Sequence, residues 1–207
     1  MVGMTNLLAS ASAALLLLTV PVVGQSDWKQ TGSIERDFAA GGLVRLDLSA
    51  GDYVVEGTSS DKIRLTWHTR TTDEARQVKV DATISGSEAT VTSEGPDNHF
   101  RVEIEVPRRS DLELRMTAGD LEIVGIEGDK DVHLRAGDLS IEVGDPSAYK
   151  LVTGSVTAGD IDASPFGITK GGLFRSFTHE GKGKFNLRAK MWAGDLRLFT
   201  EDRKSQK

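Results

Sequence analysis

A six-residue phrase that recurs five times constrains the fold of this chain more than any other feature. The phrase is an apolar residue, any residue, Ala-Gly-Asp, and a second apolar residue. In every copy the two apolar residues are five positions apart, so an unbroken strand would place them on opposite faces of a sheet. We therefore expect the chain to bend at Ala-Gly-Asp, so that both apolar residues face one core. The copies occupy residues 48–53, 116–121, 134–139, 156–161 and 191–196.

The Gly and Asp of each copy are the residues that such a corner needs. Glycine tolerates positive φ without a steric penalty, and Asp can hydrogen-bond its own nearby backbone. We therefore predict that these residues are structural corners in which each Asp caps its own turn, and that they are not a catalytic or binding motif. The predicted corner residues are Gly51, Asp52, Gly119, Asp120, Gly137, Asp138, Gly159, Asp160, Gly194 and Asp195.

The first part of the domain, residues 38–107, alternates apolar and polar residues with a period of two. Val44, Leu46 and Leu48 share one face of an expected strand, and similar alternation follows around residues 63–67, 78–84 and 100–106. Gly-Ser at 86–87 and Gly-Pro-Asp-Asn at 95–98 are turn sequences. This pattern predicts a block of antiparallel hairpins.

The second part, residues 108–200, contains four of the five copies. Gly119, Gly137 and Gly159 follow one another at intervals of roughly twenty residues, which is typical of stacked strand repeats. A Gly-rich insertion at 166–184, expected to be a mobile hairpin or loop, separates the last copy from the others. The sequence predicts an all-β fold in which the hairpin block runs into a short single-stranded β-helix (β-solenoid). The alternative is a β-sandwich.

Several of these segments resemble a known family. The segments at 45–52, 103–108, 111–114 and 117–125 are similar to the bacterial adhesin-like β-strand repeat domain, a domain of unknown function labelled putative adhesin. The resemblance covers about residues 38–200. It implies an exported, all-β stack of strands and no established activity, since a fold does not fix a function.

The N-terminus has the pattern of a secretory signal peptide. An apolar run occupies residues 7–23, and Val22 and Gly24 supply small residues for cleavage before Gln25, although no Lys or Arg precedes Lys29. The alternative is an uncleaved anchor, for which the run is shorter than the ~20 apolar residues of a membrane-spanning helix. We expect a signal peptide at 1–24, a polar lead at 25–37 and a charged tail at 201–207. The protein should then be periplasmic or extracellular.

Composition excludes several classes of function. The chain has no Cys, so it is neither a disulfide scaffold nor a Cys-anchored lipoprotein, and it has no Cys-based zinc site. The formal net charge of −6 disfavours nucleic acid or an anionic membrane surface as a partner. An envelope protein or a glycan remains as the expected partner.

No cofactor is expected. If the five corner Asp residues stacked in register they would form a ladder that resembles a calcium site, but one Asp per turn is thin coordination for an ion that takes six to eight oxygens. The four histidines, none at metal-ligand spacing, are expected to face solvent. They are His68, His99, His133 and His179. No Ser lies in a GxSxG motif, and no Gly-rich stretch has phosphate-loop spacing.

Two functional classes remain open. The first is a non-enzymatic structural, binding or adhesion-like role at the cell envelope. The second is an enzyme that acts on polysaccharide through a pair of carboxyl groups, for which the candidates are Asp129, Asp131, Glu142, Asp145 and Asp162. Trp192 occupies the variable position of the last copy and should point outward; we expect it to cover an open end of the stack or to contact a partner.

Overall fold

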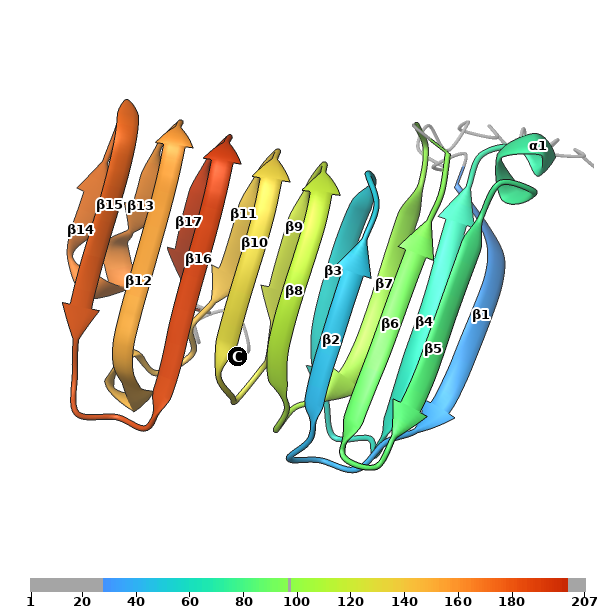
Figure 1. The fold of residues 1–207 in the computed structure, drawn as a ribbon, viewed down its shortest axis with the longest axis horizontal. Helices are drawn as coiled ribbons and strands as arrows, with labels where there is room; N and C mark the ends of the chain where they lie inside the picture. The colour runs from blue at the N-terminus through green and yellow to red at the C-terminus, as the bar shows by residue number, and fades with distance from the viewer. Residues whose placement is uncertain (1–27, 97, 201–207) are drawn as a thin grey trace, which may run out of the picture.

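The computed structural model describes residues 28–96 and 98–200, which form two β-sheets lying face to face. In Figure 1 the eight-stranded sheet is in front and the nine-stranded sheet lies behind it. The expected signal peptide and charged tail lie outside the described residues. Three short helical segments join strands: α1 (Thr72–Ala75), η1 (Pro146–Ala148) and η2 (Ser164–Phe166).

In both sheets the spatial order of the strands differs from their order along the chain. From one edge to the other, the eight-stranded sheet consists of β15 (Leu173–Glu180), β12 (Tyr149–Ala158), β16 (Phe185–Ala193), β10 (Lys130–Ala136), β8 (Asp111–Ala118), β2 (Leu43–Leu48), β6 (Glu88–Glu94) and β5 (Lys79–Ser85). The nine-stranded sheet consists of β1 (Lys29–Asp37), β4 (Lys62–Thr69), β7 (Arg101–Pro107), β3 (Asp52–Thr58), β9 (Leu121–Val124), β11 (Leu139–Glu142), β17 (Leu196–Phe199), β13 (Ile161–Ala163) and β14 (Ile168–Lys170).

The centre of both sheets is parallel. A strand of the eight-stranded sheet passes through a corner into a strand of the nine-stranded sheet, and we call such a pair a rung. Neighbouring rungs pair in register, as when Leu134 of β10 lies beside Met116 of β8 and Met191 of β16. In spatial order the rungs are β12–β13, β16–β17, β10–β11, β8–β9, β2–β3 and β6–β7.

Both ends of the stack are closed by antiparallel strands. At one end β15 pairs with β12 and β14 pairs with β13; at the other end β5 pairs with β6, and β4 and β1 continue from β7. Antiparallel end strands suit this position because short chain reversals can form them. The insertion at 166–184 is therefore neither a loop nor a hairpin, since it contains all of β14 and β15, which lie in different sheets. Most of the expected polar lead forms β1.

The order of the rungs bears on the choice between solenoid and sandwich. Successive coils of a solenoid stack in sequence order. In this protein β16–β17 lies between two earlier rungs, β10–β11 and β12–β13, and β2–β3 lies between β6–β7 and β8–β9. The structure therefore shows an all-β fold of two mixed sheets. It does not confirm a solenoid, and the sandwich alternative fits the two facing layers.

The predicted hairpin block is corrected in the same way. Only β5 and β6 form a simple hairpin within residues 38–107. β2 and β3 do not pair with each other, because the corner between them carries the chain from one sheet to the other. Alternation alone predicts strands, but it does not distinguish antiparallel from parallel partners.

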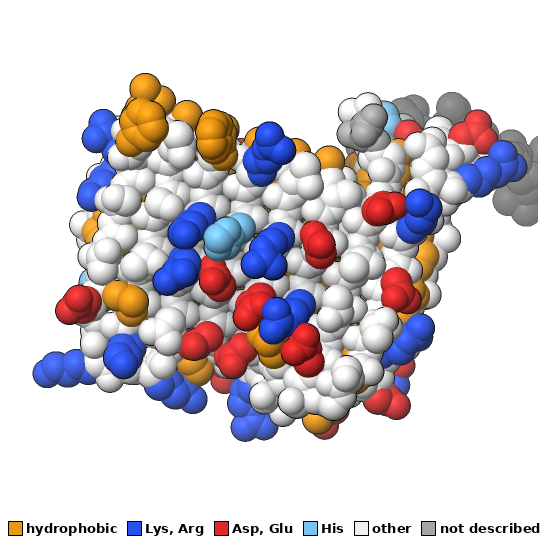
Figure 2. All heavy atoms as spheres, in the orientation of Figure 1, with side chains coloured by type: hydrophobic (Ala, Val, Ile, Leu, Met, Phe, Trp, Pro, Cys, Tyr) orange, Lys and Arg blue, Asp and Glu red, His pale blue; other side chains and the backbone are white. Residues whose placement is uncertain are grey.

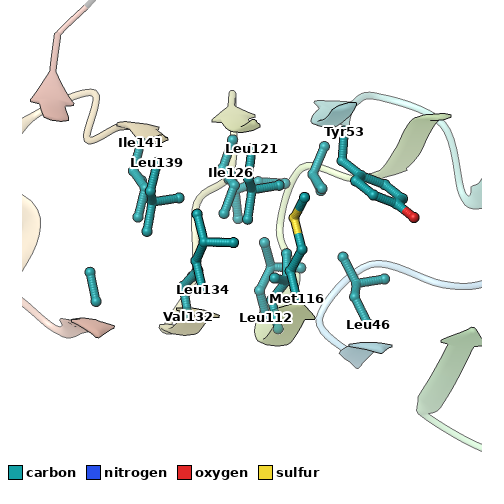
Figure 3. Close-up of a cluster of buried hydrophobic side chains, with 14 of the residues drawn as sticks. Leu46, Tyr53, Leu112, Met116, Leu121, Ile126, Val132, Leu134, Leu139 and Ile141 are labelled. Atoms are coloured by element: carbon teal, nitrogen blue, oxygen red, sulfur yellow. The ribbon is translucent and has the colours of Figure 1, made fainter. Parts of the chain in front are cut away.

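The core is one apolar layer between the sheets. Figure 3 shows Leu46, Leu112, Met116 and Leu134 of one sheet pointing toward Tyr53, Leu121, Leu139 and Ile141 of the other. The apolar residues that flank each Ala-Gly-Asp are all buried, as the five-residue offset predicts. They are Leu48, Tyr53, Met116, Leu121, Leu134, Leu139, Val156, Ile161, Met191 and Leu196.

Within the described residues, no helix has the length and apolar character required to cross a membrane.

Candidate functional site

The five corner glycines lie above one another along one edge of the stack. All five have positive φ, between 106° at Gly119 and 157° at Gly51. They are also packed against each other's backbones. A Cβ atom on Gly119 would lie 2.0 Å from the carbonyl oxygen of Gly51, and one on Gly137 would lie 2.0 Å from that of Gly119. Neither position has room for any side chain.

Backbone hydrogen bonds link these corners from rung to rung. The amide of Gly119 donates to the carbonyl of Ala136 at 2.9 Å, and the amide of Gly137 donates to that of Ala193 at 3.1 Å. Two residues after Gly119, the amide of Leu121 donates to the carbonyl of Asp138 at 2.9 Å. The parallel ladder thus continues through the bend, and these polar groups of the corner are satisfied.

Three of the corner carboxylates accept hydrogen bonds from outside their own turns. The amide of Asp160 donates to Oδ1 of Asp195 at 2.9 Å, and the amide of Asp195 donates to Oδ1 of Asp138 at 3.1 Å. Oδ1 of Asp160 accepts from the amide of Gly172 at 3.2 Å. The prediction of local capping is therefore wrong for these three residues. Asp52 instead lies 3.9 Å from the guanidinium of Arg101.

The corners are spread along the stack, one on each rung that carries the phrase. Among residues 28–96 and 98–200, no three or more His, Asp or Glu side chains come together in a group that could hold a metal ion. The carboxylates of Asp138 and Asp195 are arranged as acceptors for the neighbouring rung.

The four histidines do not come together. His99 lies 3.0 Å from Glu74, and this hydrogen bond is the main reason that the pKa of Glu74 is lowered to about 2. His133 lies 3.1 Å from Asp131, and the ring of His179 lies 4.8 Å from that of Phe166. His68 is half-buried on β4, with no hydrogen-bond partner for its Nδ1 among the described residues.

The carboxylates proposed for an enzyme are dispersed, with one exception. Asp131 lies on the outer face of the eight-stranded sheet, and Asp129 holds the amide of Asn186 at 2.8 Å. Asp162 accepts from the amide of Ser164 at 3.0 Å. Glu142 and Asp145 do line one cleft of about 790 Å³.

Glu142 and Asp145 each have a structural role in that cleft. Glu142 accepts from the amide of Gly125 at 2.8 Å, and Asp145 caps η1 by accepting from the amide of Ser147 at 2.9 Å. The two side chains are therefore better explained as loop anchors than as a catalytic pair.

The same cleft borders a buried lysine that the sequence interpretation missed. Lys130 pairs in register with Leu112 and Leu187, and its side chain is 2% exposed. Its Nζ donates to the carbonyls of Ile126 at 2.8 Å and Gly128 at 3.2 Å, and it lies 3.0 Å from the hydroxyl of Tyr149. The alternation of Lys130 with Val132 and Leu134 was the signal that it points inward.

Burial lowers the pKa of Lys130 to about 8. The unfolded chain, in which the lysine has a pKa of 10.5, therefore binds more protons than the folded chain between these pH values, and folding becomes more favourable as pH rises. From pH 7 to 9.5 the free energy of unfolding should rise by about 2 kcal/mol more in the wild type than in Lys130→Met. Urea unfolding at several pH values checks this. A difference that does not change with pH contradicts it.

The outer face of the eight-stranded sheet carries the most exposed aromatic side chains of the described chain. Phe174 on β15 is 80% exposed and Trp192 on β16 is 68% exposed. Both point away from the core, as do Arg135 of β10, Lys190 of β16 and Arg115 of β8. We call these five residues the aromatic–basic face. In Figure 2 hydrophobic side chains stand out over the upper ends of β15 and β16, and basic side chains gather over β16, β10 and β8.

Strand register fixes how these side chains are arranged. Val156 of β12 lies between Met191 of β16 and Arg175 of β15, and Ala158 lies between Ala193 and Leu173. The intervening residues Phe174, Thr157 and Trp192 therefore form one row across three strands. Arg135 continues that row on β10, because its neighbours Leu134 and Ala136 pair with Met191 and Ala193.

Lys190 and Arg115 lie in the next row of the outer face, in direct register with His133 between them. Within residues 28–96 and 98–200, none of Arg115, Arg135 and Lys190 forms an ion pair. By contrast, Glu103 and Glu122 flank Val54 on the outer face of the nine-stranded sheet.

Two predictions about this region are resolved. Trp192 points outward, as its parity indicates. It does not cover an open end of the stack, because β16 lies between β12 and β10 in the interior of the sheet. Phe174 was not singled out from the sequence, because the glycines around it indicated a loop rather than an edge strand.

Comparison with solved structures shows where this fold occurs. A putative cell adhesion protein from Clostridium sporogenes superposes with a TM-score of 0.55 at 10% identity, over 82% of this chain and 99% of that chain. Putative adhesins from Parabacteroides merdae and Bacteroides fragilis align over 81% of this chain and over 80% and 96% of theirs, with TM-scores of 0.29 and 0.28 at 16% and 9% identity. The superposition on the Clostridium sporogenes structure confirms, at the level of fold, the resemblance to adhesin-like domains drawn from the sequence. No protein-family model and no curated protein sequence matches the chain.

Proposed function

We propose that this chain is an exported, non-enzymatic binding domain with an adhesion-like role at the cell envelope, and that it contacts its partner through the aromatic–basic face. The observation that carries this proposal is the position of Phe174 and Trp192. Two large aromatic side chains are exposed in one row of one sheet face, beside basic residues without ion-pair partners among the described residues. Exposed aromatic and arginine side chains on a rigid surface are typical of recognition sites.

The proposal of a binding role rather than catalysis is supported by the chemistry of the carboxyl groups. Catalytic pairs need carboxyl groups with separated pKa values and access to substrate. Asp129, Glu142, Asp145 and Asp162 instead accept hydrogen bonds from backbone amides, which gives each of them a structural role.

Two further observations support export and adhesion. The apolar run at 7–23 resembles the hydrophobic region of a signal peptide, and Val22 and Gly24 supply small residues for cleavage. The similar structure from Clostridium sporogenes is described as a putative cell adhesion protein.

The test is retention on immobilised ligands. Wild-type protein and the double variant Phe174→Gly/Trp192→Ala are applied to a glycan array and to surfaces coated with envelope proteins. We expect retention on at least one ligand class and a loss of at least about tenfold in the double variant, because truncating two central aromatic contacts removes most of the binding energy. Arg197→Gln, on the outer face of the nine-stranded sheet, is the matched control and should bind like the wild type.

Two results would contradict the proposed function. One is equal retention of the wild type and the double variant, which would place binding elsewhere. The other is turnover of a glycan that Glu142→Gln or Asp145→Asn abolishes, which would restore the enzyme alternative.

A further inference from the structure

We infer that the aromatic–basic face takes a linear acidic polysaccharide, which lies across the strands with sugar rings on Phe174 and Trp192 and carboxylates on Arg135 and Lys190. This inference rests on the proposed function and specifies its ligand. It follows from the spacing, the backbone strain and the charges of the face.

The spacing of the aromatic side chains suits a chain of sugar rings. Phe174 and Trp192 occupy one row on strands that are separated by β12 alone. With neighbouring strands about 4.8 Å apart, the backbones of the two residues lie roughly 10 Å apart. Thr157 lies between them, and Ser155 lies in the next row. Aromatic platforms separated by hydroxyl groups match the apolar ring faces and the hydroxyl groups of a polysaccharide.

Phe174 is held in this position at a cost to the fold. Its φ is 53°, in the left-handed region that a bulky side chain rarely adopts, and its side chain is 80% exposed. A phenylalanine there contributes almost no burial to offset the strain. Backbone strain that is not offset by side-chain packing is typical of functional sites.

The charges of the aromatic–basic face indicate that its ligand is negatively charged. The chain has a net charge of −6, yet the rows that contain Trp192 and Lys190 carry Arg135 and Arg115 and no carboxylate from β15 to β8. The carboxylates that border these rows are Asp131, which contacts His133 at 3.1 Å, and Asp47 of β2, in register with Arg115. The nearest corner carboxylates, of Asp138 and Asp195, each accept an amide of the adjoining rung. A basic row on an acidic protein is complementary to a polyanion.

The shape of the face favours an extended polymer over a bilayer. Leu173, which is 63% exposed, adjoins Phe174 on the edge strand, but Thr157 lies between Phe174 and Trp192. The exposed apolar side chains are therefore interrupted along the row and do not form one contiguous patch that could enter lipid. The row also lies on a sheet surface, and the cleft of about 790 Å³ lies elsewhere, lined by Glu142 and Tyr149.

The experiment compares ligands that share a backbone and differ in charge. Calorimetric titrations use polygalacturonate and its methyl ester, with alginate and hyaluronate as further acidic polymers and phosphatidylglycerol vesicles as the lipid arm. The wild type should bind at least one acidic polymer, with affinity that falls as NaCl is raised. The methyl ester should bind at least about tenfold more weakly than polygalacturonate if polygalacturonate is the polymer bound.

Variants test the named side chains. Trp192→Ala and Phe174→Gly should each weaken binding at least about tenfold, and Phe174→Gly should also raise the melting temperature because glycine relieves the strain at φ 53°. Arg135→Gln/Lys190→Gln should lower both the affinity and its salt dependence. Arg197→Gln, on the opposite face, should change neither.

Three kinds of result would overturn the inference, and each leads to a different conclusion about the ligand. If the wild type bound polygalacturonate and its methyl ester with equal affinity, and Trp192→Ala weakened both, the ligand would not be recognised by its charge. The inference would then be wrong, and the proposed function would still hold. Binding of vesicles without any acidic polymer would show a lipid surface to be the partner. The inference would also be overturned if Trp192→Ala and Phe174→Gly bound the acidic polymer with the affinity of the wild type. The same holds if the wild type bound none of polygalacturonate, alginate and hyaluronate.

Discussion

Replacing Gly119 by alanine is expected to lower the free energy of unfolding by more than about 3 kcal/mol. Two effects combine at this position. The backbone has a φ of 106°, which L-residues with a side chain rarely adopt, and the new Cβ atom would lie 2.0 Å from the carbonyl oxygen of Gly51. That carbonyl is backbone of the neighbouring rung, so relief requires the rungs to separate. Urea unfolding followed by circular dichroism measures the change.

Gly41→Ala separates the two effects. Gly41 also has positive φ, 88°, but nothing lies within 4 Å of the position of a Cβ atom there. This variant should lose about 1 kcal/mol, which is the conformational cost alone. If Gly119→Ala were no more destabilising than Gly41→Ala, the close stacking of the corners would be refuted.

The neighbouring aspartate provides a second comparison. Asp120 is exposed, and Asp120→Asn should change stability by no more than about 0.5 kcal/mol. Gly119→Val should cost at least as much as Gly119→Ala, because valine adds two methyl groups at the blocked position. Equal stability of Gly119→Val and Asp120→Asn would end the interpretation of Ala-Gly-Asp as a structural corner.

The second large effect is expected at the closed end of the stack. Phe177 is 6% exposed and holds β15 onto β12, where a Cβ atom on Gly154 would lie 2.2 Å from its ring. Phe177→Ala should cost about 3 to 5 kcal/mol, because it opens a cavity beneath the edge strand. Loss of β15 would also expose an edge of the parallel sheet, so the variant should self-associate on size-exclusion chromatography.

Phe174→Ala is the matched control on the same strand. Its side chain faces solvent, so removing the ring should leave both stability and oligomeric state unchanged. If Phe177→Ala and Phe174→Ala were equally stable and monomeric, β15 would not close the stack as described.

The corners were the most predictable part of the fold. The constant five-residue offset between apolar flanks, seen at Leu48 and Tyr53 or at Leu134 and Leu139, requires a change of direction if both residues are to be buried. The bond from the amide of Asp195 to Oδ1 of Asp138 was not predictable, because it joins residues far apart in sequence. A short turn motif in the sequence predicts only hydrogen bonds between residues close together in the chain.

The order of the rungs could not be predicted either. β16–β17 enters the stack between β10–β11 and β12–β13 because residues 166–184 first close the end of the stack and the chain then returns. Rungs with the same Ala-Gly-Asp corner offer similar backbone hydrogen-bonding groups to an adjacent rung. The sequence therefore does not indicate which rungs lie next to each other. Recurrence of the Ala-Gly-Asp phrase favours a solenoid, but a two-sheet stack whose rungs are not in sequence order produces the same recurrence.

The candidate site was predictable in part. Parity alone predicts that Trp192 points outward. The row from Phe174 to Arg135 depends on which strands flank β16, and Phe174 lies within a strand at a position where Gly171 and Gly172 indicated a loop.

The central claim, that the protein recognises its ligand through the aromatic–basic face, is tested most directly by the indole N–H signals in a ¹H–¹⁵N spectrum. The chain has three tryptophans: Trp192 on this face, Trp67 packed against the core, and Trp28 beneath the guanidinium groups of Arg70 and Arg101. On titration with an oligomer of the bound polysaccharide, the signal of Trp192 should shift and that of Trp67 should stay in place. A shift at Trp28 with none at Trp192 would contradict the claim.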